Sequence, residues 1–146
     1  MESQGSPTKD PLAFWSNGGP GCSGLIGFMT EHGPFRPNAD LSLSLNKDSW
    51  NTISNVVYIE SPAGVGFSYS DDKADYTTGD AQTAQDNYNL IQAFLTRFPE
   101  YQTNDLYITS ESYGGHYIPT LAKQIVDENS AAATTGNRVL NFKGFA

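Results

Sequence analysis

Residues 105–117 read DLYITSESYGGHY, and this stretch decides the fold class. The run LYIT is apolar, aromatic and β-branched, which is typical of a buried strand, and a helical pattern begins after the glycines. Between them lies SESYG at 110–114, with small residues two before and two after Ser112. A sharp strand-to-helix turn needs small residues there and holds the central serine in a strained conformation. The segment predicts a nucleophile elbow, although an ordinary polar turn that caps a helix fits it equally well.

On both sides of this elbow, strand and helix patterns alternate along the chain. Two helical patterns cover residues 80–98 and the stripe from Ile118 to Val126, and residues 61–79 and 129–138 read as loops. Alternation of this kind predicts an α/β fold, a mainly parallel sheet flanked by helices, with its chemistry at the carboxyl ends of the strands. Further strands are predicted at Pro11–Ser16, Asn55–Ile59 and Val139–Phe145.

Length and composition narrow the class of protein. The 146 residues suffice for one domain, and 16 acidic against 8 basic residues give a net charge of -8. Such a charge argues against nucleic acid as a partner, and no apolar run is long enough for a membrane span. Neither His32 nor His116 stands in a metal-ligand spacing, so we expect no metal and no cofactor. Oligomeric state cannot be read from the sequence.

A second candidate for chemistry is the glycine-rich loop WSNGGPGCSG at 15–24, which follows a predicted strand. Consecutive glycines let backbone N–H groups converge on one point, because no Cβ obstructs them. Gly19 in this loop and Tyr113 after the elbow serine could then supply the two N–H groups of an oxyanion hole. A plain Asn-Gly turn is the alternative. A phosphate-binding loop is excluded, because neither of its glycine patterns occurs here.

Seven motifs together resemble the serine carboxypeptidase family, in which they occur in the same order. The resemblance covers essentially the whole chain. It implies that residues 1–146 are the N-terminal part of a serine carboxypeptidase catalytic domain, with a partial α/β-hydrolase fold. The motifs are WSNGGPGCSG at 15–24, EHGPF at 31–35, SWN at 49–51, ESPAGVGFSYS at 60–70, TGD at 78–80, FPEY at 98–101 and ESYGGHYIP at 111–119.

The resemblance also implies roles for individual residues. Ser112 is similar to the family nucleophile, and Gly19 and Tyr113 to the oxyanion donors. The triad aspartate and histidine are expected after residue 146, so we expect this chain to be inactive by itself. Four residues match the group that binds the C-terminal carboxylate of a peptide or protein substrate, and one matches a disulfide cysteine whose partner this chain lacks. These are Asn17, Gly18, Glu31 and Glu111 for the carboxylate, and Cys22 for the disulfide.

A pair of glutamates is an unusual receptor for a carboxylate, yet it has a physical basis. Two carboxyls in contact cannot both ionise, so the pKa of at least one rises, and the protonated one donates a hydrogen bond. We therefore expect Glu31 and Glu111 to give peptide hydrolysis an acidic optimum. An acyltransferase of the same family and a non-catalytic, partner-binding chain remain alternatives. The family resemblance places the protein in the secretory pathway, in a lysosome or vacuole or outside the cell.

Overall fold

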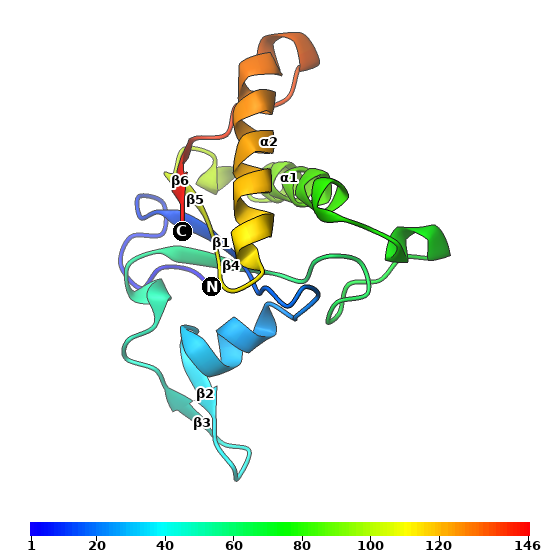
Figure 1. The fold of residues 1–146 in the computed structure, drawn as a ribbon. Helices are drawn as coiled ribbons and strands as arrows, with labels where there is room; N and C mark the ends of the chain where they lie inside the picture. Colours follow the sequence, from blue (N-terminus) through cyan, green and yellow to red (C-terminus); the bar gives the residue numbers. More distant parts are fainter.

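The computed structural model describes residues 1–146 as a parallel sheet with two long helices and several short elements (Figure 1). The sheet has the strand order β4-β1-β5-β6, and every pair in it is parallel. This arrangement confirms the predicted fold class. The strands of this sheet are β1 (Leu12–Ser16), β4 (Asn55–Ile59), β5 (Leu106–Ser110) and β6 (Phe142–Phe145).

Strand β1 lies inside the sheet, and its neighbours fix its register. Phe14 stands opposite Val57 of β4 on one side and Ile108 of β5 on the other. All five residues of β1 are buried, as expected for a parallel strand covered on both faces. The carboxyl ends of β1 and β5 pair Ser16 with Ser110. The glycine-rich loop and the elbow therefore leave the sheet side by side.

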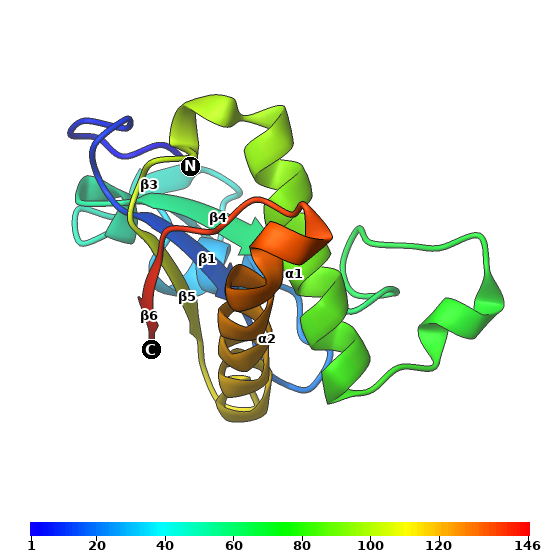
Figure 2. The ribbon, with the colours of Figure 1, turned by 90° about the horizontal axis from the view of Figure 1, so that it is seen from above.

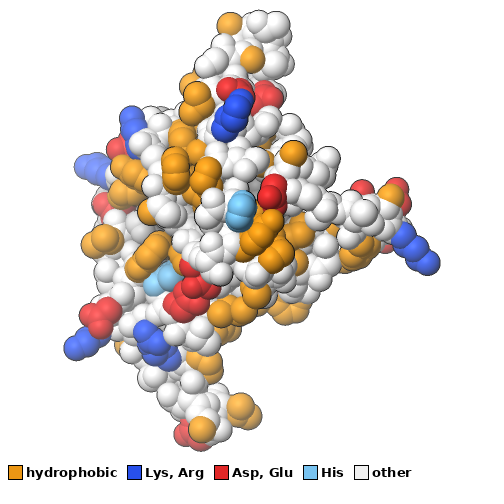
Figure 3. Space-filling model, in the orientation of Figure 1, with side chains coloured by type: hydrophobic (Ala, Val, Ile, Leu, Met, Phe, Trp, Pro, Cys, Tyr) orange, Lys and Arg blue, Asp and Glu red, His pale blue; other side chains and the backbone are white.

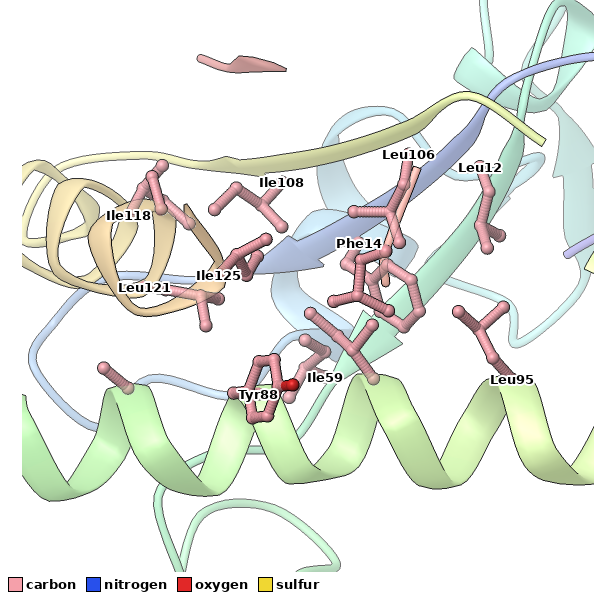
Figure 4. Close-up of a cluster of buried hydrophobic side chains, with 14 of the residues drawn as sticks. Leu12, Phe14, Ile59, Tyr88, Leu95, Leu106, Ile108, Ile118, Leu121 and Ile125 are labelled. Atoms are coloured by element: carbon pink, nitrogen blue, oxygen red, sulfur yellow. The ribbon is translucent and has the colours of Figure 1, made fainter. Parts of the chain in front are cut away.

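Helices α1 (Asp80–Arg97) and α2 (Gly114–Thr135) pack against the sheet and against each other (Figure 2). Figure 4 shows the core that they enclose, with Ile108 and Phe14 of the strands facing Ile125 of α2 and Tyr88 of α1. Burial of these apolar side chains is the main stabilising contribution, and it fixes where each strand ends relative to the helices.

One loop prediction was wrong. Residues 129–135 continue α2, which ends at Gly136 in the left-handed conformation with a φ of 73°. The alanines of this stretch favour a helix more than its Ser, Asn and Thr residues disfavour one. Asn129 also anchors the turn, because its side chain donates to the Leu140 carbonyl (2.9 Å) and accepts from the Leu140 amide (2.8 Å).

The remaining elements are short. Residues 61–79 form the predicted loop, apart from one 3₁₀ turn, and the hairpin of β2 and β3 projects from the body in Figure 1. No helix combines the length and the apolar character that crossing a bilayer requires. These elements are η1 (Gly27–Glu31, a π-helical turn), β2 (Phe35–Pro37), β3 (Leu43–Leu45), and the 3₁₀ turns η2 (Trp50–Thr52), η3 (Lys73–Tyr76) and η4 (Pro99–Tyr101).

Candidate active site

The elbow predicted around Ser112 is present. Strand β5 ends at Ser110, α2 begins at Gly114, and Ser112 between them has a φ of 53°. A residue with a side chain occupies this left-handed region at a cost in free energy, and such strain gathers at functional sites. The Ser112 residue is exposed at the turn. This conformation between a strand and a helix is the one that a nucleophile elbow requires, and it favours the elbow over an ordinary polar turn.

Small residues at both ends of the elbow are a steric necessity. A Cβ on Gly114 would overlap the Ser110 side chain, both its Cβ and its Oγ. Ser110 also has a bonding role, because its Oγ donates to the carbonyl oxygen of Ser16 at 2.6 Å. The hydroxyl at this position therefore links the end of β5 to the end of β1.

The glycine-rich loop lies directly against the elbow. A Cβ on Gly18 would lie 2.6 Å from the Tyr113 amide nitrogen and 3.1 Å from the Ser112 Cβ, so only glycine lets the two turns approach this closely. Gly19 follows with a φ of 108°. Neither the Gly19 N–H nor the Tyr113 N–H is engaged by the backbone of the chain.

Asn17 joins the two turns through its side chain, which is 1% exposed. Its amide nitrogen donates to Glu111 Oε1 at 2.9 Å. Its oxygen accepts from Trp15 Nε1 at 2.9 Å and from the Gly27 amide at 3.1 Å. Because the oxygen is held by two donors, the amide nitrogen must face the glutamate. Trp15 is a buried residue that orients Asn17.

Glu31 ends η1 and reaches the same cluster. Burial raises the pKa of its carboxyl, the charge of Glu111 raises it further, and the Asn17 amide partly opposes both. The backbone carbonyl of Glu31 is held by the Arg36 guanidinium at 2.9 Å. The structure therefore brings together the three side chains that the resemblance groups as a carboxylate receptor.

An aromatic wall behind this cluster was not predicted. The His32 ring stacks on Trp50 and meets Trp15 edge-on, with ring centroids 4.1 and 4.2 Å apart, and its Nδ1 lies 3.1 Å from the Tyr58 hydroxyl. Burial lowers the pKa of His32, which favours its neutral ring, and the charge of Glu111 partly opposes this. Burial and the Glu31 charge raise the pKa of Tyr58 to about 12. These residues come from separate segments, so no local sequence pattern could have revealed the wall.

The elbow also contacts α1. The Tyr113 hydroxyl donates to the Asp80 carboxylate at 3.2 Å, and the Tyr113 ring lies 4.8 Å from that of His116. His116 is exposed on α2 and its side chain forms no hydrogen bond. Cys22 is a free, half-buried cysteine. No group of three or more potential ligands among residues 1–146 could hold a metal ion.

Comparison with known proteins agrees with this geometry. A family model described as "Serine carboxypeptidase" matches residues 1–146. The chain is 49% identical over 147 residues to the "Lysosomal protective protein" of Mus musculus, covering 98% of this chain and 31% of that protein. It is also 49% identical over 143 residues to "Serine carboxypeptidase 24" of Arabidopsis thaliana. That match covers 96% of this chain and 30% of that protein.

A solved carboxypeptidase structure has the same fold over most of this chain. The crystal structure of a prohormone-processing carboxypeptidase from Saccharomyces cerevisiae superimposes with a TM-score of 0.81 at 32% identity, covering 94% of this chain and 30% of that one. The chain thus spans about 30% of the length of its relatives. Its sheet and helices form part of an α/β-hydrolase fold. The strained serine, the glycine-rich loop against it and these matches together show that the chain belongs to the serine carboxypeptidase family.

Proposed function

We propose that this protein contributes the nucleophile, the oxyanion hole and the carboxylate receptor of a serine carboxypeptidase, which removes C-terminal residues from peptides. One observation supports this most strongly: the Gly18 backbone lies against both Ser112 and Tyr113. A hydroxyl, two unengaged amides and an acid pair then share one small region at the carboxyl ends of β1 and β5.

The chemistry follows from that arrangement. Ser112 Oγ attacks the carbonyl carbon of the last peptide bond, and the developing oxyanion accepts hydrogen bonds from the Gly19 and Tyr113 amides. The start of α2 at Gly114 adds its positive helix end on the same side. The C-terminal amino acid leaves as the amine, and water then hydrolyses the acyl-enzyme.

Recognition of the free C-terminus rests on Asn17, Glu31 and Glu111, beside the backbone of Gly18. With its pKa raised, Glu31 keeps its proton over a wider pH range, and the protonated carboxyl donates a hydrogen bond to the substrate carboxylate. The oriented Asn17 amide donates a second hydrogen bond. An acyltransferase needs no such receptor. The hydrogen bond from Asn17 to Glu111 therefore favours the peptidase over the acyltransferase alternative.

A serine needs a base, and neither histidine of this chain is placed to act as one. His32 is buried in the aromatic wall, and His116 points into solvent from α2. We therefore propose that the base and its orienting acid come from outside residues 1–146, and that this chain alone is inactive. By likeness to its relatives we propose a location in the secretory pathway, in a lysosome or vacuole.

A chimera tests the proposal. Residues 1–146 replace the matching segment of "Serine carboxypeptidase 24" of Arabidopsis thaliana, with which they share 49% identity. We expect the chimera to cleave a blocked dipeptide and to bind a fluorophosphonate at Ser112, and Ser112→Ala to abolish both. In Glu111→Gln, the pH profile of kcat/KM should move.

Three results would contradict the peptidase assignment. A folded chimera that does not react with the fluorophosphonate would favour the non-catalytic, partner-binding alternative. A chimera that reacts but transfers acyl groups from a sugar ester and leaves peptides intact would favour the acyltransferase. An unchanged pH profile in Glu111→Gln would remove the acid pair from the mechanism.

A further inference from the structure

One buried nitrogen of the aromatic wall has no partner in the chain. Two buried side-chain atoms lack a hydrogen bond, His32 Nε2 and Asn104 Oδ1. Asn104 precedes β5, at the opposite end of that strand from the elbow, and its amide nitrogen donates to the carbonyls of Pro7 and Asp10. His32 is 7% exposed and follows Glu31 directly. The unpaired ring nitrogen therefore belongs to the surroundings of the carboxylate receptor, and the chemistry proposed above gives it no role.

The surroundings of His32 Nε2 indicate which ring nitrogen carries the proton. A Cβ on Gly27 would lie 2.4 Å from Trp15 Nε1 and 3.2 Å from His32 Nε2, so both nitrogens face the Gly27 Cα. Trp15 Nε1 is a donor and binds Asn17 Oδ1. No acceptor lies within hydrogen-bonding distance of Nε2, and an orphaned buried N–H is rarer than an orphaned buried acceptor. The contacts therefore favour a proton on Nδ1, which lies 3.1 Å from the Tyr58 hydroxyl.

The His32 ring is held by three aromatic side chains from three other segments. It is nearly parallel to the rings of Trp50 and Tyr58, at 20° and 19°, and meets Trp15 edge-on. The backbone is held too, because the His32 carbonyl accepts from the Trp50 amide at 3.0 Å. Elements η1, β1, η2 and β4 therefore meet at this residue. A ring that tilted would displace Glu31, its neighbour in the chain, or Trp15.

The charge of the ring also matters to the receptor. The charge of Glu111 acts on His32, and that of Glu31 acts on Tyr58. A cationic ring here would favour ionisation of both glutamates, and the receptor would lose the proton that it donates to a substrate carboxylate. The Arg36 guanidinium donates to backbone carbonyls of η1 at 2.9 Å. On the face that Figure 3 shows, Lys and Arg side chains lie in its outer parts, whereas acidic side chains also occur near its centre.

We propose that His32 is a positioning residue of the carboxylate receptor. Its ring is neutral and carries its proton on Nδ1, which donates to the Tyr58 hydroxyl. The fixed ring determines where Glu31 stands relative to Asn17, the amide that Trp15 orients. His32 itself does not touch the substrate. That the receptor serves a peptidase rests on the proposed function, whereas the state of the ring does not.

NMR of the 146-residue chain with isotope-labelled histidines tests the state of the ring. Nitrogen shifts and couplings to the ring hydrogens distinguish the two neutral tautomers from each other and from the cation. We expect His32 to stay neutral and protonated at Nδ1 alone over the pH range in which His116, exposed on α2, gains its proton. A His32 ring that is protonated at Nε2, mixes both tautomers or titrates together with His116 would overturn the proposal.

The chimera described above tests the positioning. Tyr58→Phe removes the hydroxyl and keeps the ring. We expect the KM for a blocked dipeptide to rise at least about threefold with kcat nearly unchanged, because only binding of the carboxylate is weakened. The reaction of Ser112 with a fluorophosphonate, which has no carboxylate, should keep its rate. Tyr107→Phe makes the same change at a half-buried tyrosine of β5 and should alter neither value.

Two results would contradict the positioning role: an equal KM in Tyr58→Phe and Tyr107→Phe, or a loss of fluorophosphonate reactivity as large as the rise in KM. The second result would mean that the wall supports the whole site rather than the receptor. Failure of the proposed function is a separate result, in which the unmodified chimera folds but does not react with the fluorophosphonate. The tautomer measured in the 146-residue chain would then still decide whether the ring is fixed as proposed.

Discussion

Two turns leave neighbouring strands of the same sheet, and they reach their shapes by opposite means. The glycine-rich loop after β1 removes side chains, so that Gly18 can touch the elbow and Gly19 can adopt a φ of 108°. The elbow after β5 keeps a side chain on Ser112 and accepts a φ of 53°. This difference agrees with the proposed division of roles, in which the elbow carries the reacting hydroxyl and the glycine-rich loop presents a backbone N–H group.

The largest expected effect comes from putting a side chain on the first turn. In Gly18→Ala, the new Cβ would lie 2.5 Å from the Glu111 carbonyl oxygen and 2.6 Å from the Tyr113 nitrogen. Both neighbours are backbone and cannot rotate away, so unfolding by denaturant should show a loss of about 3 kcal/mol.

Gly115→Ala is the matched control, because a Cβ on Gly115 meets nothing within 4 Å. In the first turn of α2 it should be neutral or stabilise by up to about 1 kcal/mol. Equal stability of the Gly18→Ala and Gly115→Ala variants would mean that the two turns do not touch.

The second effect concerns the crossing of strand and helix at the elbow. Gly114→Ala should cost about 2 kcal/mol, because the new Cβ overlaps the Ser110 side chain. Ser110→Gly removes the obstacle, although it also loses the hydrogen bond to the Ser16 carbonyl. A double-mutant cycle should therefore give a favourable coupling between the two substitutions. Additive losses would show that the overlap is relieved elsewhere.

The third effect isolates the backbone strain at Ser112, the proposed nucleophile. Ser112→Gly should stabilise the chain by about 1 kcal/mol, because glycine adopts a positive φ without steric cost. Ser112→Ala also removes the hydroxyl but keeps the Cβ, so it should not stabilise. Thermal unfolding of the two variants separates strain from loss of the hydroxyl. A Ser112→Gly variant no more stable than Ser112→Ala would mean that the serine is unstrained.

The smallest effect concerns the carboxyl of Glu31 and its interaction with the charge of Glu111. The folded pKa of Glu31 is raised above its ordinary value of 4.5. Between these values the folded chain binds more protons than the unfolded chain, so its stability falls as pH rises through the folded pKa. In Glu111→Gln one source of the shift disappears. An NMR titration should then give a lower pKa for Glu31, and the fall in stability should be smaller and occur at lower pH.

A Glu31 pKa that is unchanged in Glu111→Gln would show that the two carboxyls do not interact. Asp40→Asn serves as the control. It also removes one negative charge, but from an exposed position whose carboxylate bonds only within its own turn, to Ser42. The titration of Glu31 should be the same in this variant as in the unmodified chain.

Local sequence patterns predicted the elements whose conformation depends on residues close in the sequence. The four strands of the parallel sheet, both helices and the elbow at Ser112 follow from periodicity, small residues and turn chemistry, and the structure contains them. The 129–138 loop was misassigned because polar residues outnumbered the alanines that continue α2 to Thr135. In that stretch helix propensity and the Gly136 cap decided the outcome.

The candidate site also has a part that the sequence indicated and a part that only the structure reveals. Sequence motifs drew attention to Asn17, Glu31 and Glu111, but only the fold shows that Asn17 bonds to Glu111. The aromatic wall of His32, Tyr58 and Trp50 could not be predicted, because its members are brought together by tertiary packing alone.

The contact between the two turns can be measured without catalysis. In the structure the Gly18 Cα carries a hydrogen that points at Ser112 and Tyr113, because a Cβ in its place would lie 3.1 Å from the Ser112 Cβ. Strong nuclear Overhauser effects are expected from the Gly18 Hα to the Ser112 Hβ and to the Tyr113 amide hydrogen. Their absence, in a chain that still shows the β1–β5 contacts of Phe14 with Ile108, would contradict the shared site.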